Sequence, residues 1–273
     1  MSNITNSCPS CNLKRSASSS LCPKCDKKAF LDKCKSGYDA INTMPSSKHF
    51  WFTVLFLFLN MVLPAIIIIS VAPPTDLDLN FNITDTISDS PLSIASLIIG
   101  QLAVVIAFLL LYRKYLAGVF AKSMNIKAFL TALVIAVIAI GIGLGWDWIQ
   151  SFFQIAANEN QESIIIMAKN YPALSFVQVV IGAALAEEIA FRVGIFGFVN
   201  RKSKVLAYIV SAVFFALVHV SITTGSPQEL LSLPMYIIMG LFLAYTYEKH
   251  GLLASITVHT INNLVGWVQI LMS

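Results

Sequence analysis

The stretch from Ala173 to Val199 reads ALSFVQVVIGAALAEEIAFRVGIFGFV, and it decides what kind of protein this chain is. It is long enough to cross a bilayer, because a transmembrane helix needs about 20 mostly apolar residues. Three ionisable side chains interrupt it, at Glu187, Glu188 and Arg192. An ionised residue at the centre of a membrane helix costs roughly 2.5–3.5 kcal/mol on insertion scales. Such residues must be paired, hydrated in an internal cavity or neutral, and they mark a candidate functional site.

The composition of the whole chain is that of an integral membrane protein. Hydrophobic residues make up 57% of the 273 residues and charged residues only 12%, whereas soluble domains carry about 25% charged residues. Apolar runs of about 20 residues predict an all-α polytopic membrane protein with about seven transmembrane helices. The predicted spans are roughly 50–72, 92–112, 128–146, 173–198, 205–223, 230–247 and 252–272.

The positive charges gather on one side of this predicted topology. If seven helices alternate, all of the 18 Lys and Arg residues except Lys169 and Arg192 fall on the same side. Lys and Arg are enriched in cytoplasmic loops. The bias therefore places the N-terminus in the cytoplasm and the C-terminus outside, in a multi-pass protein of a cell membrane. These loops also account for the net charge of +4 without any nucleic-acid partner.

The first 48 residues are polar and contain all of the cysteines of the chain. Four thiolates in two Cys-x-x-Cys pairs can bind one structural zinc ion, so we predict a small N-terminal zinc ribbon. Two redox pairs are the alternative, and Cys34 is left as a free thiol. Such a ribbon can dock a cytoplasmic partner, contact lipid or nucleic acid, or cap the N-terminus, and we expect nucleic acid least. The predicted zinc ligands are Cys8, Cys11, Cys22 and Cys25.

Later spans carry three more polar side chains at a depth similar to that of Glu187. His219 ends the sequence FALVH, and His259 and Asn263 lie one helical turn apart in VHTINN. Counted from the flanking cytoplasmic charges, these residues lie on the order of 15–22 Å deep, at about 1.5 Å per residue. Side chains at one depth on three helices can meet in one cavity. A single histidine could be a packing residue, but this combination predicts a functional site.

These residue types have definite roles in hydrolysis. A carboxylate in a low-dielectric surrounding is a stronger base, and an imidazole beside it can help to deprotonate water. A second imidazole and an amide can donate hydrogen bonds to a developing oxyanion. Glu188 and Arg192 are spaced i,i+4, so they can form an ion pair on one helix face. Glu187 points about 100° away from Glu188 and is free for a different role.

Three motifs follow one another on successive predicted helices. They are EExxxR from Glu187 to Arg192, FxxxH from Phe215 to His219 and HxxxN from His259 to Asn263. In this order they resemble the CPBP family of intramembrane proteases, also known as the ABI family. That family includes the CAAX prenyl endopeptidase and bacterial members linked to bacteriocin immunity. The resemblance covers roughly residues 172–270.

The resemblance implies a role for each motif position. A metalloprotease-like zinc site is compatible with two histidines and a glutamate, and so is a metal-free glutamate mechanism, which we favour. The implied roles are water activation by Glu187 and His219, oxyanion stabilisation by His259 and Asn263, and bracing of the catalytic helix by Glu188 and Arg192.

The sequence thus predicts three parts: a cytoplasmic zinc ribbon and linker at 1–48, three transmembrane helices at 49–149, and a four-helix catalytic core at 150–273. We expect a peptide hydrolase that cleaves a membrane-embedded or lipidated protein or peptide in the bilayer. A non-catalytic scaffold or immunity protein of the same fold is the first alternative. A proton-coupled transporter is the second, and the scarcity of polar residues in the first three spans counts against it. The fused ribbon favours a prokaryotic source.

Overall fold

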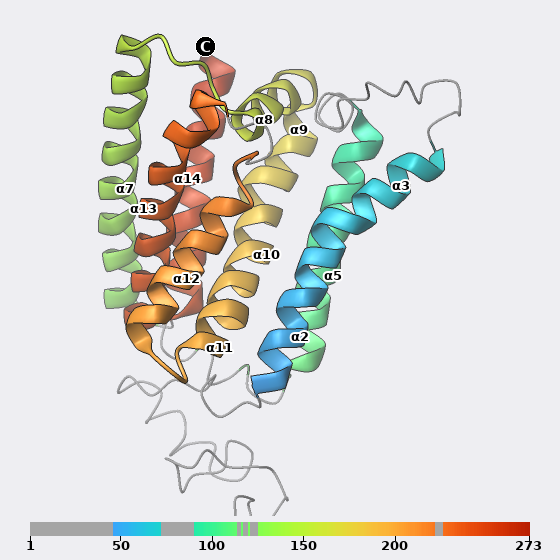
Figure 1. Cartoon of the computed structure of the whole chain (residues 1–273), viewed down its shortest axis with the longest axis vertical. Helices are drawn as coiled ribbons and strands as arrows, with labels where there is room; N and C mark the ends of the chain where they lie inside the picture. The colour runs from blue at the N-terminus through green and yellow to red at the C-terminus, as the bar shows by residue number, and fades with distance from the viewer. Residues whose placement is uncertain (1–45, 72–89, 114–115, 117–119, 121–124, 222–225) are drawn as a thin grey trace, which may run out of the picture.

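The structure is a computed structural model, and its regular elements are helices throughout the described residues (Figure 1). The predicted zinc ribbon, with all of its cysteines, lies outside the described part of the chain, so it stays a prediction together with its zinc. The described residues are 46–71, 90–113, 116, 120, 125–221 and 226–273.

Two long helical segments form an inclined pair at one side of the molecule (Figure 1). They approach closely where Gly100 faces the backbone of Leu59, because a Cβ at this glycine would overlap the Leu59 carbonyl oxygen. The first segment runs through α2 (Ser46–Leu57), the π-helical turn η2 (Phe58–Val62) and α3 (Leu63–Val71), and the second is α5 (Pro91–Leu111).

The other helices form a bundle, and the stretch with the two glutamates runs through it as one continuous helix with two π-helical parts. Its consecutive pieces are α9 (Pro172–Ser175), η4 (Phe176–Ala183), α10 (Ala184–Glu188), η5 (Ile189–Phe196) and α11 (Gly197–Val199). The other helices of the bundle are α7 (Ile126–Phe152), α8 (Glu159–Asn170), α12 (Lys204–Leu217), α13 (Pro227–His250) and α14 (Leu252–Met272).

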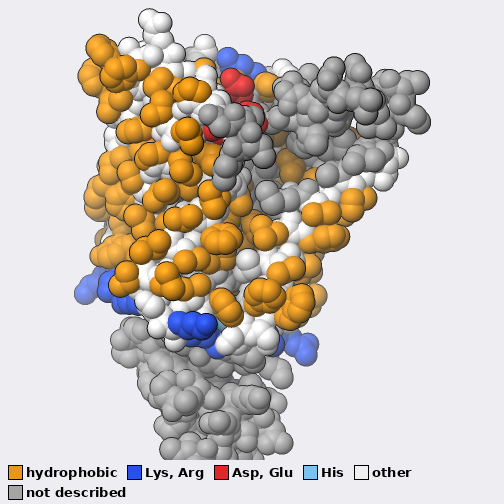
Figure 2. Space-filling model, in the orientation of Figure 1, with side chains coloured by type: hydrophobic (Ala, Val, Ile, Leu, Met, Phe, Trp, Pro, Cys, Tyr) orange, Lys and Arg blue, Asp and Glu red, His pale blue; other side chains and the backbone are white. Residues whose placement is uncertain are grey.

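The helices and the surface are those of a multi-pass membrane protein. Within the described residues, three helices are long and apolar enough to cross a bilayer, namely α5, α7 and α13. Figure 2 shows a belt of hydrophobic side chains above Lys and Arg side chains at the lower end, with Asp and Glu side chains near the upper end. Helical segments also lie within the other predicted spans. The count of seven spans and the cytoplasmic N-terminus stay predictions.

The predicted fifth span, 205–223, is too long. The helix α12 ends at Leu217, and the next turn tightens so that the His219 N–H bonds the Ala216 carbonyl at 3.0 Å. Its 14 residues span about 21 Å at about 1.5 Å per residue, which is less than the roughly 30 Å of a hydrocarbon core. The start of α8, which lies near the upper end of the bundle (Figure 1), is bonded to the segment beyond this end through Asn158 and the His219 carbonyl.

A row of aromatic side chains joins the inclined pair to the bundle. Phe56 on α2 packs edge-to-face on Phe191 at 5.5 Å between ring centres, and Phe191 packs on Phe215 at 5.4 Å. All three rings are buried. Phe215 in turn lies 4.5 Å from the ring of His219. The core thus runs from α2 to a candidate site residue without a break.

Candidate active site

Glu188 is buried in a complete set of hydrogen bonds. Arg192, one turn along the helix, donates from Nε to Oε2 at 3.0 Å and from Nη2 to Oε1 at 3.3 Å. Ser255 Oγ donates to Oε2, and His259 Nδ1 lies 3.1 Å from Oε1. The Glu188 and Arg192 side chains are both fully buried. A carboxylate accepts about four hydrogen bonds, so Glu188 has no acceptor position left for a substrate.

Arg192 extends this network to α12. Its Nη1 donates to Ser211 Oγ at 2.7 Å, and that hydroxyl donates to the Phe191 carbonyl at 3.0 Å. The guanidinium carbon also lies 5.3 Å from the centre of the Phe215 ring, within the range of a cation–π contact. The Glu188–Arg192 pair therefore fixes its own helix to both α12 and α14.

Glu187 points away from that network and into a cavity. Its Oε2 lies 3.5 Å from Nε2 of His219 and 4.0 Å from Nε2 of His259. This oxygen is buried and has no hydrogen-bond partner within the described residues. The structure thus brings together three side chains that come from α10, from just beyond α12 and from α14.

The other ring nitrogen of each histidine is already engaged. His219 Nδ1 lies 2.7 Å from the Phe215 carbonyl oxygen, and His259 Nδ1 lies 3.1 Å from Glu188 Oε1. Carbonyl and carboxylate oxygens accept hydrogen bonds, so each Nδ1 carries the hydrogen. In a neutral ring Nε2 is then the free acceptor. Both rings therefore present a proton-accepting nitrogen toward Glu187.

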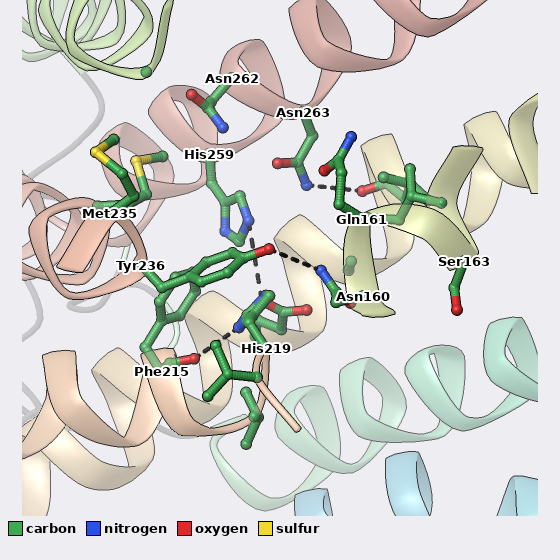
Figure 3. A pocket seen from close by; sticks show the side chains of 18 of the residues that line it. Asn160, Gln161, Ser163, Phe215, His219, Met235, Tyr236, His259, Asn262 and Asn263 are labelled. Carbon is green, nitrogen blue, oxygen red and sulfur yellow. Dashed lines mark hydrogen bonds and ion pairs between the residues drawn. The ribbon is translucent and has the colours of Figure 1, made fainter. Parts of the chain in front are cut away.

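The cavity in front of Glu187 has a volume of about 610 Å³, within the usual range for ligand pockets. Figure 3 shows His219 and Tyr236 on one side and His259 with its neighbouring amides on the other. Amide side chains can pair with the N–H and C=O groups of an extended peptide, while methionines offer an adaptable apolar wall. The amides are Asn160, Gln161, Gln178, Asn262 and Asn263, and the methionines are Met167, Met235 and Met239.

Asn263 lines this cavity, but its amide also has a structural bond. Its Nδ2 donates to the Val179 carbonyl of η4 at 2.9 Å. An amide nitrogen carries two hydrogens, so one remains for a second acceptor. Asn263, the predicted oxyanion donor, therefore lies at the cavity. Its Nδ2 has one hydrogen on the Val179 carbonyl and one available for a ligand.

Whether a metal takes part at this site stays a prediction. No three His, Cys, Asp or Glu side chains among the described residues are grouped so that they could hold a metal ion. Glu187, His219 and His259 are suitable ligand types for zinc. The metal-free preference stays a prediction, and no reaction step proposed below runs through a metal.

Comparison with known proteins identifies the part of the chain that holds these residues. Residues 169–265 match the family model described as type II CAAX prenyl endopeptidase Rce1-like. The chain is also 30% identical over 116 residues to the UPF0177 protein YvdC of Lactococcus lactis subsp. lactis (strain IL1403). This alignment covers 42% of the chain and spans 42% of the length of that relative. No solved structure matches the chain significantly.

The family-matched segment, residues 169–265, contains all three motifs. The resemblance to an endopeptidase family of membrane proteins is therefore supported for this segment. The roles of the individual residues stay predictions.

Two serines of the Glu188 network were missed by the sequence reasoning. Ser211 precedes Phe215 by four residues, and Ser255 precedes His259 by four residues. Residues four apart lie on one face of a helix, so extending each motif one turn toward the N-terminus would have found both. These serines bond Arg192 and Glu188.

Tyr236 was missed as well, and no sequence signal indicates it. Its ring stacks on that of His219 with 4.7 Å between centres and 26° between planes. Its hydroxyl accepts a hydrogen bond from Asn160 Nδ2 at 3.2 Å. Tyr236 thus covers one face of the site histidine and connects it to α8.

Polar side chains from outside the family-matched segment hold both π-helical parts of the glutamate helix. Widened turns leave backbone groups that need other partners. His49 on α2 is buried and bonds the Val193 carbonyl of η5 at 2.7 Å. Gln101 on α5, with its amide oriented to satisfy both neighbours, donates to the Gln178 carbonyl at 3.2 Å and accepts from Ala183 N at 3.3 Å. The helices α2 and α5 therefore do contribute polar contacts to the helix that carries the site.

Proposed function

We propose that this chain is an intramembrane endopeptidase that hydrolyses a peptide bond of a membrane-embedded or lipidated protein or peptide. The observation that carries the proposal is the Oε2 atom of Glu187. It is buried, it has no hydrogen-bond partner in the described residues, and two imidazole Nε2 atoms face it at 3.5 and 4.0 Å. An unsatisfied buried carboxylate oxygen is costly and is expected where a water or a substrate completes the set. The endopeptidase family model, which covers these residues, supports the proposal.

Glu187 and His219 would activate the water in this reaction. A water between Glu187 Oε2 and His219 Nε2 gives one proton to the carboxylate as its oxygen bonds to the substrate carbonyl carbon. The π electrons of the carbonyl move to its oxygen, which becomes the oxyanion of a tetrahedral intermediate. The proton held by Glu187 then passes to the amide nitrogen as the C–N bond breaks. The products are a carboxylic acid and an amine.

His259 and Asn263 would stabilise the oxyanion. With a proton on Nε2, His259 would donate to the oxyanion from that nitrogen while its Nδ1–H stays on Glu188. Asn263 has one amide hydrogen beyond the one bonded to Val179. Losing a single donor of this kind typically slows a hydrolase by about 10²–10³-fold.

The test compares Glu187→Gln and His219→Ala with the control Glu162→Gln, which changes an exposed carboxylate on α8. Proteins whose fragments disappear from host membranes when Glu187 is changed are the candidate substrates. Reconstituted with the strongest candidate, both site variants should cleave at least about 10²-fold more slowly than wild type, and the control should match it. Full cleavage and full biological activity in both variants would show that the chain is a scaffold rather than a protease.

A further inference from the structure

The helix α8 lines the cavity beside His219, and its start is bonded to the segment that follows α12 (Figures 1 and 3). Most of α8 precedes the family-matched segment, which begins at residue 169. His219 itself lies beyond the last residue of α12, so the regular hydrogen bonds of that helix do not fix its position. What holds this short segment decides where the imidazole meets Glu187.

Asn158 connects the start of α8 directly to the backbone of His219. Its Oδ1 accepts a hydrogen bond from Gln161 N at 3.1 Å, which caps the helix. Its Nδ2 donates to the His219 carbonyl at 2.9 Å. The side chain is buried, with 2% of its surface exposed. One amide therefore both begins α8 and holds the residue that faces Glu187.

Glu229 makes a second connection between the same two segments. Its Oε1 accepts from the Glu159 N–H at 2.8 Å, and its Oε2 accepts from the Ser221 N–H at 2.7 Å. It is also 2% exposed. The two oxygens of one buried carboxylate thus bind the first turn of α8 and the residue two positions after His219.

Tyr236 makes the third connection, through its hydroxyl to Asn160 on α8 and through its ring to His219. Ordinary helix capping explains one bond of Asn158 and one bond of Glu229, because both groups stabilise the N-terminus of α8. It does not explain the second bond of each, which runs to the His219 segment in both cases. Three separate contacts between α8 and the His219 segment indicate that these residues fix the position of His219.

We propose that Asn158 and Glu229 are positioning residues that hold His219 against Glu187, and that α8 is the support through which they act. The inference rests on the proposed function, because its effect is on the rate of peptide-bond cleavage. Loosening either link should lower kcat, since Glu187 and His219 then meet a water less often in the reactive geometry.

Asn158→Ser isolates the link to His219 from the cap of α8. A serine hydroxyl can still cap the helix, but it is too short to reach the His219 carbonyl as well. The matched control is Asn125→Ser, because Asn125 Oδ1 caps α7 in the same way by accepting from Ala128 N at 2.8 Å. This chain already uses serine as an N-cap at Ser90, Ser203 and Ser226.

The measurements are kcat and KM per folded molecule for the reconstituted full-length chain, with the melting temperature in detergent as the folding check. Asn158→Ser should lower kcat at least tenfold and change KM less than threefold, whereas Asn125→Ser should stay within twofold of wild type. Glu229→Gln should also lose kcat, because its amide nitrogen would face a backbone N–H where an oxygen accepted before. A purely structural role would lower the melting temperature and leave kcat per folded molecule unchanged.

Glu187→Gln in the same assay separates the two proposals. If Glu187→Gln is inactive while Asn158→Ser and Glu229→Gln keep kcat within twofold of wild type, the positioning inference is wrong and the proposed function stands. If Glu187→Gln cleaves like wild type, the proposed function fails and the positioning inference fails with it. If Glu229→Gln does not fold, Asn158→Ser alone decides, because its cap is retained.

Discussion

Replacing Glu188 by Gln should destabilise the protein far more than any single change at its surface. The substitution keeps the shape of the side chain but leaves the fully buried guanidinium of Arg192 without its counter-charge. Removing one partner of a buried ion pair costs about 3–5 kcal/mol, a large share of the 5–15 kcal/mol that holds a typical protein folded. The glutamine side chain also has a single acceptor oxygen, whereas Arg192, Ser255 and His259 all donate to the two oxygens of Glu188.

An exposed ion pair of the same chain provides the control. Lys204 and Glu248 lie 2.6 Å apart, and the Lys204 side chain is 54% exposed. Glu248→Gln should cost less than about 1 kcal/mol, because water screens such pairs. Adding Arg192→Met to Glu188→Gln should recover part of the lost stability, since it removes the buried charge that has lost its partner.

The assay is denaturant unfolding of the full-length chain in detergent micelles, followed by circular dichroism. The expected order of stability is wild type and Glu248→Gln together, then the double variant, then Glu188→Gln. If the free energy of unfolding of Glu188→Gln lies within about 1 kcal/mol of the wild-type value, the reasoning is refuted. Arg192 would then not depend on Glu188 as its buried counter-charge.

Three further predictions concern other parts of the molecule. Gly240→Ala should cost about 1–3 kcal/mol, because the new Cβ would lie 2.8 Å from the Ala212 Cα where α13 meets α12; an unchanged melting temperature would contradict this close contact. Tyr236→Leu should lower kcat by up to about tenfold through loss of the stacking on His219, and Tyr236→Phe should lower it less; equal losses would assign the effect to the hydroxyl. The full-length chain should bind about one zinc ion, measured by elemental analysis, and zinc that remains bound after substitution of the ribbon ligands would place a metal at the site instead. That variant changes to serine the residues Cys8, Cys11, Cys22 and Cys25.

The convergence of Glu187, His219 and His259 could be predicted from the sequence. The reasoning needed only the rise per residue of a helix and the positions of the cytoplasmic charges, and both are local properties of the chain. The Glu188–Arg192 pair could also be predicted, because i,i+4 neighbours share a face whatever the helix packs against.

Other parts of the site depend on which helices pack against one another, and the hydrophobic periodicity of the sequence does not predict this. Glu229 precedes a predicted span as an ordinary loop carboxylate would, yet it is buried and accepts a hydrogen bond from the first turn of α8. The end of α12 at Leu217 was missed for a similar reason. The apolar run continues past it, so hydropathy does not show where the helix stops.

The contacts of His49 and Gln101 have a consequence for how this protein can be divided. The family model matches residues 169–265, but both π-helical parts within this range are bonded by side chains from α2 and α5. A fragment cut at those limits would expose a carbonyl at Val193 and a carbonyl at Gln178 to lipid, where no water can replace the lost partners. A chimaera that transplants the segment into a relative should therefore carry α2 and α5 with it.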